Sequence, residues 1–330
     1  MPSFDAAEAA GRLLGYAPSR VDRIKGGRNA EVWRVETPDG AYALKRYIRS
    51  DAAERLGRES AALRFLQRHG VETVPRVAAA DAESGIILMS WLPGEPVSEA
   101  SEKDILACAD FLVLLRDLSR APDAVALPDA KDPCCSAAEV LSQIDARIAK
   151  FAGPARRDSR LRRFLDTEVA PRRDALAVLP SRYLEDFPQK FRTLTTADFC
   201  VHNAMRAATG RLSFLDFEYF GWEDPAKAAA DFLLHPGMDL PPRLLLLFAD
   251  RMYALFGDER GFAQRLAALL PAYQLRWGLI MLNPILDAAG ASKREDADLA
   301  AVVRLQTERA TRYLQRPPIA AREERETHVG

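Results

Sequence analysis

Residues 196–220 read "TADFCVHNAMRAATGRLSFLDFEYF", and this stretch decides the fold. Two short strand-like runs flank "ATGR", in which Thr209 and Gly210 suit a two-residue hairpin turn. Pairing about that turn puts Asn203 directly opposite Asp216, with the two Cβ atoms about 5 Å apart. The stretch therefore predicts a β-hairpin that brings an amide and a carboxylate together on one face.

This pair of side chains suggests a chemistry. Mg²⁺ prefers oxygen ligands and takes few protein groups beside water and phosphate, so Asn203 and Asp216 are suited to share one such ion. Asp198 lies five residues before Asn203, where a carboxylate would orient an attacking hydroxyl and accept its proton. Each residue alone is an ordinary loop former, so only the combination carries weight. It predicts a phosphoryl-transfer site with Asp198 as base.

Three upstream features follow in the order that a nucleotide site needs. "KGGRNAEVW" at 25–33 offers Gly26, Gly27 and Asn29 to approach phosphates with backbone N–H groups. Lys45 on the following strand is placed to contact the α and β phosphates, and Glu59 on the next helix to hold the lysine. The glycine content of this loop is low, so the loop alone is weak evidence.

The segments before residue 92 are typical of strands. Short runs rich in Val, Ile, Tyr and Trp predict strands at 20–27, 30–37, 41–48, 76–81 and 85–91. Apolar residues at helical spacing predict a leading helix over 4–15 and a second over 51–70. Residues 1–92 are therefore expected to form a small antiparallel sheet with one inserted helix, preceded by the leading helix.

The rest of the chain is patterned for helices. Helix-like segments separated by Pro-containing loops lie at 102–119, 136–151, 158–176, 225–236, 240–256, 260–289 and 296–315. The hairpin region is the one clear β island among them. We expect a larger, mostly helical lobe over 93–316. The polar end "RPPIAAREERETHVG" predicts a disordered tail over 317–330.

Composition narrows the class of protein. The 330 residues carry a formal net charge of −1 and are 48% hydrophobic, as in an ordinary globular protein. Basic runs such as "PARRDSRLRR" have helical spacing and predict solvated helix faces, not a nucleic-acid site. The adjacent Cys134 and Cys135 have no further ligand at metal-site spacing, so the four cysteines are expected to be reduced thiols.

Targeting signals are not evident in the sequence. The N-terminal segment lacks a basic start followed by an apolar core, and the longest apolar run is broken by charges. A membrane span needs about 20 apolar residues. We expect a cytoplasmic protein with no membrane segment and no obligate protein partner.

Three motifs now stand together: "TADFCVHN", "LSFLDFEYF" and "GWEDP". In this order they resemble the H-x-D-x-x-x-x-N, strand-Asp-aromatic and G-x-x-D-P motifs of the aminoglycoside phosphotransferase and choline kinase family. The resemblance covers the chain from about Ile24 to about Asn283. It implies an α+β, two-lobed protein-kinase-like fold and a kinase that uses ATP and Mg²⁺.

The resemblance also implies roles for residues. Asp198 would be the catalytic base, Asn203 and Asp216 the magnesium ligands, Lys45 the phosphate ligand and Glu59 its partner. "LMSWLPG" at 88–94 is similar to the hinge of this family. There the backbone of Ser90 and Leu92 would read the adenine edge, and Met89 would lie behind the ring.

The chain departs from the family pattern in places. Thr196 stands where the family has His or Ser, so its hydroxyl is expected to shape the loop instead. His202 is a second candidate base, although a brace for the loop backbone is favoured. The acceptor side is expected to contain acidic and aromatic side chains, which suit a cationic or polyhydroxyl acceptor. They are Glu218, Tyr219, Trp222 and Asp224; Asp224 alternatively anchors its loop.

We therefore predict an ATP- and Mg²⁺-dependent phosphotransferase acting on a hydroxyl of a small molecule, with a sugar, amino sugar or aminoglycoside-like acceptor. Two alternatives remain open: an amino-alcohol kinase of the choline or ethanolamine type, and a nucleotide-binding pseudokinase without catalysis. A protein kinase is disfavoured because no A-P-E motif follows Asp216, and the short segment "EYFGWEDP" leaves too little chain for an activation loop.

Overall fold

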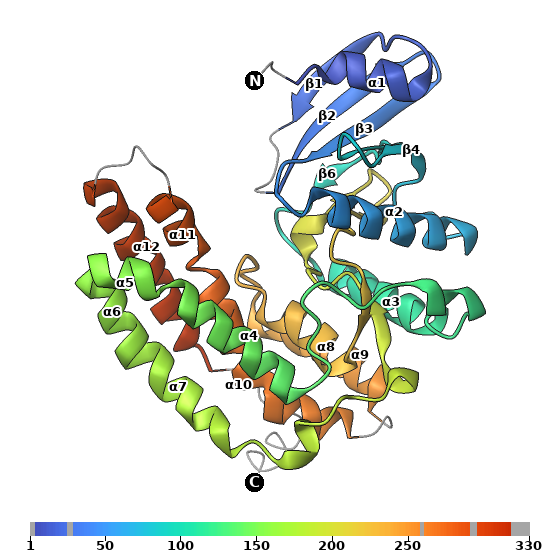
Figure 1. Ribbon diagram of the computed structural model, residues 1–330. Coiled ribbons are helices and arrows are strands. Elements are labelled where there is room, and N and C mark those ends of the chain that lie inside the picture. Colours follow the sequence, from blue (N-terminus) through green and yellow to red (C-terminus); the bar gives the residue numbers. More distant parts are fainter. Residues whose placement is uncertain (1–3, 25–28, 258–260, 291–295, 318–330) are drawn as a thin grey trace. The chain divides into compact units, whose positions relative to one another are not determined.

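The computed structural model describes residues 4–24, 29–257, 261–290 and 296–317 (Figure 1). The predictions for Gly26, Gly27 and nearly all of the 317–330 tail lie outside the described residues. The chain forms two compact units. The first contains Met1–Ala100, Leu114–Lys131 and Leu194–Trp222, and the second Ser101–Val113, Asp132–Thr193 and Glu223–Gly330. This grouping leaves the expected lobe boundary after residue 92 a prediction.

The first unit is built on a five-stranded antiparallel sheet in the order β1-β2-β3-β5-β4 (Figure 1). The strands are β1 (Arg20–Ile24), β2 (Ala30–Thr37), β3 (Gly40–Tyr47), β4 (Val77–Asp81) and β5 (Ile86–Ser90). β2 and β3 are joined at the expected "PDG" turn, with Thr37 paired to Gly40. All five strands were predicted from β-branched and aromatic runs, which fit a half-buried pleated surface.

The two faces of this sheet do different things. On β3, Leu44 belongs to the apolar cluster that packs under α1 (Ala6–Leu14). Side chains alternate along a strand, so Lys45 and Tyr47 lie on alternate sides from Leu44 and Arg46. Lys45 and Tyr47 contact α2 (Ala52–Arg68), so the opposite face carries the polar site.

The leading helix is fixed by its ends and its alanines. The Asp5 side chain accepts hydrogen bonds from the N–H groups of Ala7 and Glu8, and Gly15 closes the helix in the left-handed conformation. Ala9 and Ala10 are buried against the sheet beside Trp33 and other residues of β2 and β3. Small side chains on this face let the helix approach the strands closely.

The hairpin of residues 204–214 forms, but in a different register from the predicted one. β8 (Ala204–Arg206) pairs with β9 (Leu212–Phe214), with Ala204 opposite Phe214. The N–H of Ala207 donates to the carbonyl of Arg211 at 2.9 Å, so three residues form the loop. Gly210 takes the left-handed conformation, as three-residue hairpin loops require. The predicted two-residue turn is therefore wrong by one residue.

Short elements complete the first unit. β6 (Glu95–Pro96) adds a third strand beside β8, and β7 (Thr193–Thr195) pairs with β10 (Gly221–Glu223) at the edge of the unit. 3-10 turns cover Pro122–Ala126 and Val201–Asn203. β7 leads directly into the loop that carries Asp198.

The second unit is helical, as predicted. α3 (Glu102–Leu118) begins in it and ends in the first unit. The other helices are α4 (Ala137–Lys150), α5 (Ala152–Arg157), α6 (Ser159–Phe164), α7 (Ala170–Ala175), α8 (Pro225–Leu234), α9 (Pro242–Phe256), α10 (Phe262–Ile280), α11 (Asn283–Gly290) and α12 (Asp296–Leu314). Among the described residues, none of the helices is both long and apolar enough to cross a bilayer.

Two predicted helices of this unit are interrupted. A π-helical segment at Leu165–Val169 separates α6 from α7, and α7 has a proline in its first turn. α10 ends before the "NP" that opens α11. After α7, short 3-10 turns cover Leu176–Val178, Ser181–Tyr183 and Gln189–Phe191. Pro284 has no N–H to bond the Ile280 carbonyl, which fits the break at residues 281–282, whereas Pro271 lies within α10 without ending it.

Candidate active site

Lys45 is the centre of the candidate site. Its side chain is nearly buried at 7% exposure on β3. The ammonium lies 2.9 Å from Glu59 Oε2 on α2 and 2.8 Å from Asp216 Oδ1. A third carboxylate oxygen, Glu218 Oε2, lies 3.3 Å away. The predicted lysine–glutamate pair is therefore formed, and the chain segment after β9 joins it.

The charges around Lys45 do not balance. Burial opposes the charged form of Lys45, but the carboxylates, led by Asp216 and Glu59, raise its pKa well above the ordinary value. Lys45 therefore stays protonated, facing three carboxylates. Burial, followed by the charge of Asp216, raises the pKa of Glu218. Arg55 also pairs with Glu218, so two cations face the three carboxylates and one negative charge remains near Asp216, whose side chain is 35% exposed.

Glu59 fixes the geometry from the helix side. Its Oε2 accepts hydrogen bonds from the Lys45 ammonium and from the Tyr47 hydroxyl. Its Oε1 accepts the backbone N–H of Phe217 at 3.0 Å. One carboxylate on α2 thus holds a strand residue and the backbone next to Asp216.

Asp216 has an unusual backbone conformation, with φ of 67°. Left-handed backbone is uncommon in residues other than glycine, and Asp and Asn tolerate it better than most. The hairpin register places Asn203 opposite Leu215, whose N–H donates to the Asn203 carbonyl at 2.7 Å. Asn203 and Asp216 are thus not direct partners, which corrects the predicted pairing. Because Asp216 is left-handed, strand alternation no longer decides which way its side chain points.

The loop with Asp198 is closed by Asn203. The Asn203 side-chain amide donates to the backbone carbonyl of Asp198 at 3.0 Å. Phe199 and Cys200 are buried, and the Phe199 ring lies 5.6 Å from that of Phe214 on β9. The half-buried Asp198 carboxylate is therefore carried by a loop anchored at both ends. Because Nδ2 of Asn203 is bound to the loop backbone, its Oδ1 is the atom that can bind a ligand.

Thr196 does not do what the sequence predicted. Its hydroxyl is buried and has no hydrogen-bond partner among the described residues. The neighbouring Thr195 hydroxyl instead accepts the N–H of Ala197 at 3.2 Å, where Ala197 is left-handed with φ of 57°. The turn into Asp198 is therefore shaped by Thr195.

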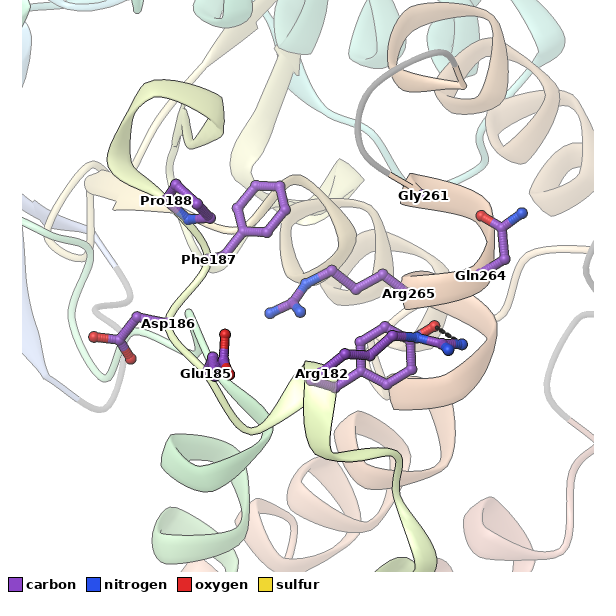
Figure 2. Close-up of a pocket in the computed structure, with 9 residues that line it drawn as sticks. Arg182, Glu185, Asp186, Phe187, Pro188, Gly261, Gln264 and Arg265 are labelled. Carbon is purple, nitrogen blue, oxygen red and sulfur yellow. Dashed lines mark hydrogen bonds between the residues drawn. The ribbon is translucent and has the colours of Figure 1, made fainter.

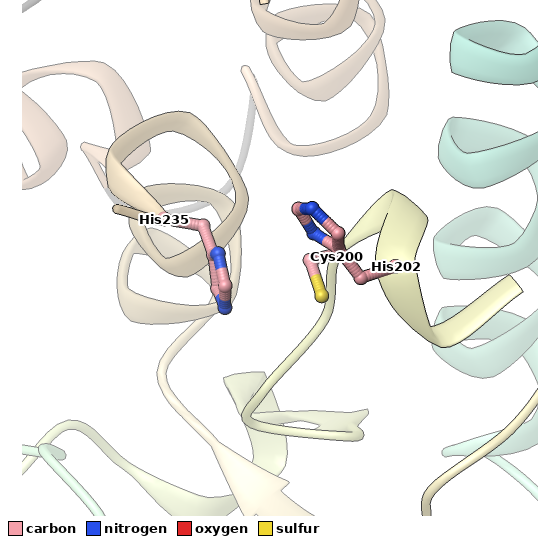
Figure 3. Close-up of side chains that lie close together, drawn as sticks. All are labelled: Cys200, His202 and His235. Atoms are coloured by element: carbon pink, nitrogen blue, oxygen red, sulfur yellow. The ribbon is translucent and has the colours of Figure 1, made fainter. Parts of the chain in front are cut away.

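His202 is exposed on the 3-10 turn that ends at Asn203 (Figure 3). One of its ring nitrogens lies within 4.8 Å of the Cys200 sulfur. Two ligands on one turn are fewer than a structural metal site requires. The third residue drawn there, His235, belongs to the second unit, where its Nδ1 accepts the N–H of Gly237 at 3.1 Å. The predicted bracing role of His202 stays a prediction.

The predicted adenine-reading segment lies at the end of β5. The Ser90 N–H donates to the Arg76 carbonyl at 2.8 Å. The Arg76 N–H donates to the Ser90 hydroxyl at 2.9 Å. In a regular antiparallel ladder it would have donated to the Ser90 carbonyl instead. The register pairs Lys45 with Ile87, so Met89, two residues on, shares the face of Lys45.

Three of the four predicted acceptor-side residues are buried and have internal partners. Glu218 is 2% exposed and bound within the Lys45 cluster. The Trp222 indole donates to the Ala124 carbonyl at 3.1 Å. Asp224 caps α8, accepting the Ala226 N–H at 2.8 Å, and this fits its alternative role as a loop anchor. The acceptor role of these residues stays a prediction, and of the four Tyr219 is the one that is partly exposed.

The other carboxylate oxygen of Asp224 contacts Arg265, which lines a pocket of about 530 Å³ in the second unit (Figure 2). Tyr183 and Phe187 form aromatic walls of this pocket, and Glu185 contributes an acidic side chain. The Arg265 guanidinium lies 4.8 Å from the Phe187 ring centroid. Arg182 and Asp186 also line it, so the pocket contains side chains of both charges.

Glu223 is a buried acid next to this anchor. Its Oε1 accepts the N–H groups of Cys134 and Asp224, both at 2.9 Å, while Oε2 has no hydrogen-bond partner among the described residues. Burial raises the pKa of Glu223 to about 7, opposed by Lys227. The folded chain therefore holds a proton here at a pH at which the unfolded chain has lost it.

Glu223→Gln is expected to change how stability depends on pH. Above the unfolded pKa near 4.5 the folded state alone keeps the proton, so stability falls as pH rises to 7. Titration of Glu223 should lower the free energy of unfolding of the wild type by about 3 kcal/mol between pH 5 and 8. The variant cannot titrate at this position and should not show this decrease. Urea unfolding at both pH values measures the difference, with exposed Glu185→Gln as control. Identical pH slopes in wild type and Glu223→Gln would contradict the assignment.

Sequence reasoning missed Arg55, which lies between Asp51 and Glu59 on one helix face. The three residues are spaced by four, so the pattern that could have revealed it was present. The Arg55 guanidinium bonds Glu218 and Asp51. Lys131 also bonds Asp51, at 2.7 Å. No local rule connects these residues to the segment after Asp216.

A lysine on a strand paired with a glutamate on a helix, together with a carboxylate that follows a short hairpin, is the arrangement typical of kinases. The family model described as "Phosphotransferase enzyme family" matches residues 20–263. The chain belongs to this phosphotransferase family, and it is a small-molecule kinase. A comparison with curated protein sequences found no match.

Solved structures agree with the fold. A thermostable mutant of aminoglycoside phosphotransferase APH(4)-Ia without ligand is 16% identical, with a TM-score of 0.59, over 94% of this chain and 98% of that one. Spectinomycin phosphotransferase APH(9)-Ia, solved with ADP and spectinomycin, is 12% identical with a TM-score of 0.59, over 95% and 100%. ADP-bound APH(2'')-Ib is 16% identical with a TM-score of 0.53, over 94% and 99%. The predicted kinase-like α+β fold is confirmed.

Proposed function

We propose that this chain transfers the γ-phosphoryl group of ATP to a hydroxyl of a small molecule, with Mg²⁺ as cofactor. One observation carries the proposal: a buried, protonated lysine faces the carboxylates of Glu59 and Asp216, and the second of these stays partly exposed. An ion pair with a purely structural role needs only one carboxylate for the lysine, and Asp216 is a second one. A site for phosphates and a divalent cation needs both charges.

The residues present fit Mg²⁺. Asp216 offers a carboxylate in a region of excess negative charge, and Asn203 offers Oδ1 because its Nδ2 is bound to the Asp198 carbonyl. Both are the hard oxygen ligands that this ion prefers. When bound, Mg²⁺ would neutralise charge on the phosphate oxygens.

The chain's own residues supply the remaining chemistry. Lys45, held by Glu59, would contact the α and β phosphates. Asp198, on its anchored loop, would orient the acceptor hydroxyl and accept its proton as the new oxygen–phosphorus bond forms. The bond to the bridging oxygen then breaks and ADP leaves with that electron pair. Asn29, where the chain enters β2, would contribute to the phosphate side.

We assign the adenine to the end of β5. The Ser90 carbonyl and the Leu92 N–H would read its edge, while Met89 would lie behind the ring on the Lys45 face. Support comes from the Arg76 N–H, which binds the Ser90 hydroxyl and leaves the carbonyl to a ligand.

For the acceptor, we propose an amino sugar, sugar or aminoglycoside-like molecule ahead of an amino alcohol. Relatives of the same fold were solved with hygromycin B and with spectinomycin. Tyr219 remains the predicted acceptor contact of the first unit.

The test is acceptor-dependent ADP release. Purified protein is incubated with ATP, with and without Mg²⁺, and pools of aminoglycosides, hexosamines and amino alcohols. The proposal expects at least one pool to increase ADP formation, only with Mg²⁺, and a phosphorylated product by mass spectrometry. Binding of the ATP analogue AMP-PNP without phosphorylation of any pool would favour the pseudokinase alternative.

A further inference from the structure

Arg55 of α2 is held on three sides in the first unit. It is 7% exposed. Its Nη1 donates to Glu218 Oε1 at 2.6 Å, and its Nε donates to Asp51 Oδ1 at 2.8 Å. The guanidinium also lies 4.8 Å from the centroid of the Tyr219 ring. The planar guanidinium bonds two different carboxylates through two nitrogens while it lies over an aromatic ring, and a lysine ammonium lacks this planar shape.

Glu218 is shared among three segments of the chain. The same Oε1 that accepts from Arg55 accepts from Asn29 Nδ2 at 2.9 Å. Asn29 Nδ2 also lies 3.1 Å from the Tyr219 hydroxyl, and Glu218 Oε2 lies 3.3 Å from Lys45. One carboxylate thus connects α2, the start of β2 and the lysine on β3.

The backbone between Asp216 and Glu218 needs such restraint. Asp216 is left-handed, an unfavourable conformation for a residue with a side chain, and it persists where surrounding contacts impose it. The two residues that follow are both held from α2. Phe217 N–H donates to Glu59, and Glu218 accepts from Arg55.

We propose that Arg55 is a positioning residue of the active site, which through Glu218 holds Asp216 in its metal-binding conformation and Asn29 beside the nucleotide. This inference rests on the proposed function. Without the guanidinium, Glu218 keeps only Asn29 and Lys45 as polar partners in this cluster. Its carboxylate then draws Lys45 away from the phosphates and releases the restraint on Asp216.

The test is calorimetric titration of AMP-PNP in the presence and absence of Mg²⁺. Arg55→Met, which keeps the length of the side chain, should raise the Kd in Mg²⁺ by about tenfold or more. The Kd without Mg²⁺ should rise by a smaller factor, because only the contributions of Lys45 and Asn29 are then weakened. Arg55→Lys should recover only part of the affinity, because the charge returns without the two nitrogens that bond Asp51 and Glu218 together.

Arg58→Met is the matched control. Arg58 lies on the same helix, its side chain is 11% exposed, and it donates to the Phe220 carbonyl at 3.1 Å. It has no bond to Glu218. Arg58→Met should therefore alter thermal unfolding but leave the Kd in Mg²⁺ within about twofold. A general loss of packing lowers stability without displacing Glu218 or Asp216.

A double variant separates positioning from simple charge loss. Asn29→Ala removes the other donor to Glu218 Oε1, so combining it with Arg55→Met should cost less than the product of the two single effects. Independent effects that multiply would overturn the shared role of Glu218.

The outcomes distinguish the inference from the proposed function. A wild type that does not bind AMP-PNP with Mg²⁺ would refute the proposed function itself. A wild type that binds, together with a folded Arg55→Met that binds equally well, would overturn only the inference. Should Arg55→Met fail to unfold cooperatively, Arg55→Lys decides: undiminished affinity overturns the role of Arg55, and a clear loss supports it.

Discussion

Asp198→Asn is expected to lower the rate of acceptor phosphorylation by about 10² to 10⁴-fold, the usual contribution of a positioned general base. The change removes one acceptor of protons and keeps the size of the side chain. Asn203 bonds the backbone carbonyl of Asp198, not its carboxylate, so the loop keeps its brace. Initial rates at saturating ATP measure the effect.

Nucleotide binding separates chemistry from folding in this variant. The Kd of AMP-PNP with Mg²⁺ should stay within about threefold of wild type, because Asp198 handles the acceptor and not the nucleotide. Asp174→Asn, an exposed aspartate on α7, is the control and should leave the rate unchanged. Undiminished turnover in Asp198→Asn would remove Asp198 from the role of base.

Asp216→Asn is expected to weaken Mg²⁺-dependent nucleotide binding by about a hundredfold or more, since loss of even an indirect partner costs about 10 to 100-fold in metal affinity. Asparagine is the informative replacement because it tolerates the left-handed backbone of this position. Alanine would add backbone strain to the loss of the ligand.

The measurement is calorimetric titration of AMP-PNP at several Mg²⁺ concentrations. In Asp216→Asn the added ion should improve affinity far less than in wild type, while binding without Mg²⁺ should change little or improve because Lys45 loses a competing partner. Equal dependence on Mg²⁺ in both proteins would contradict the metal assignment. Asp186→Asn, on an exposed loop of the second unit, controls for a general change of charge.

Local pattern was sufficient for most elements of the fold. The strands of the five-stranded sheet follow from β-branched and aromatic runs, and α1 and α2 from apolar spacing. The Lys45–Glu59 pair was also predictable, because a strand and the helix packed on its face bring these positions together. The secondary-structure elements and the Lys45–Glu59 pair both follow from hydrophobic periodicity, which can be read from neighbouring residues in the sequence.

The hairpin shows where local pattern ends. "ATGR" suits a two-residue or a three-residue loop, and the choice shifts every cross-strand pair. The structure places Gly210 in the left-handed position of a three-residue loop, so Asn203 faces Leu215 and not Asp216. The sequence contained the right residues for the site but left their register open.

The sequence alone determined that Asp198, Asn203 and Asp216 lie on one loop and hairpin, because their spacing fixes that neighbourhood whatever the rest of the chain does. Tertiary structure decided which carboxylates are exposed. Glu218 is buried through Arg55, 163 positions away in the sequence, while Asp216 stays partly open because its backbone turns left-handed. Burial and charge pairing between distant segments follow from packing, and no local pattern encodes them.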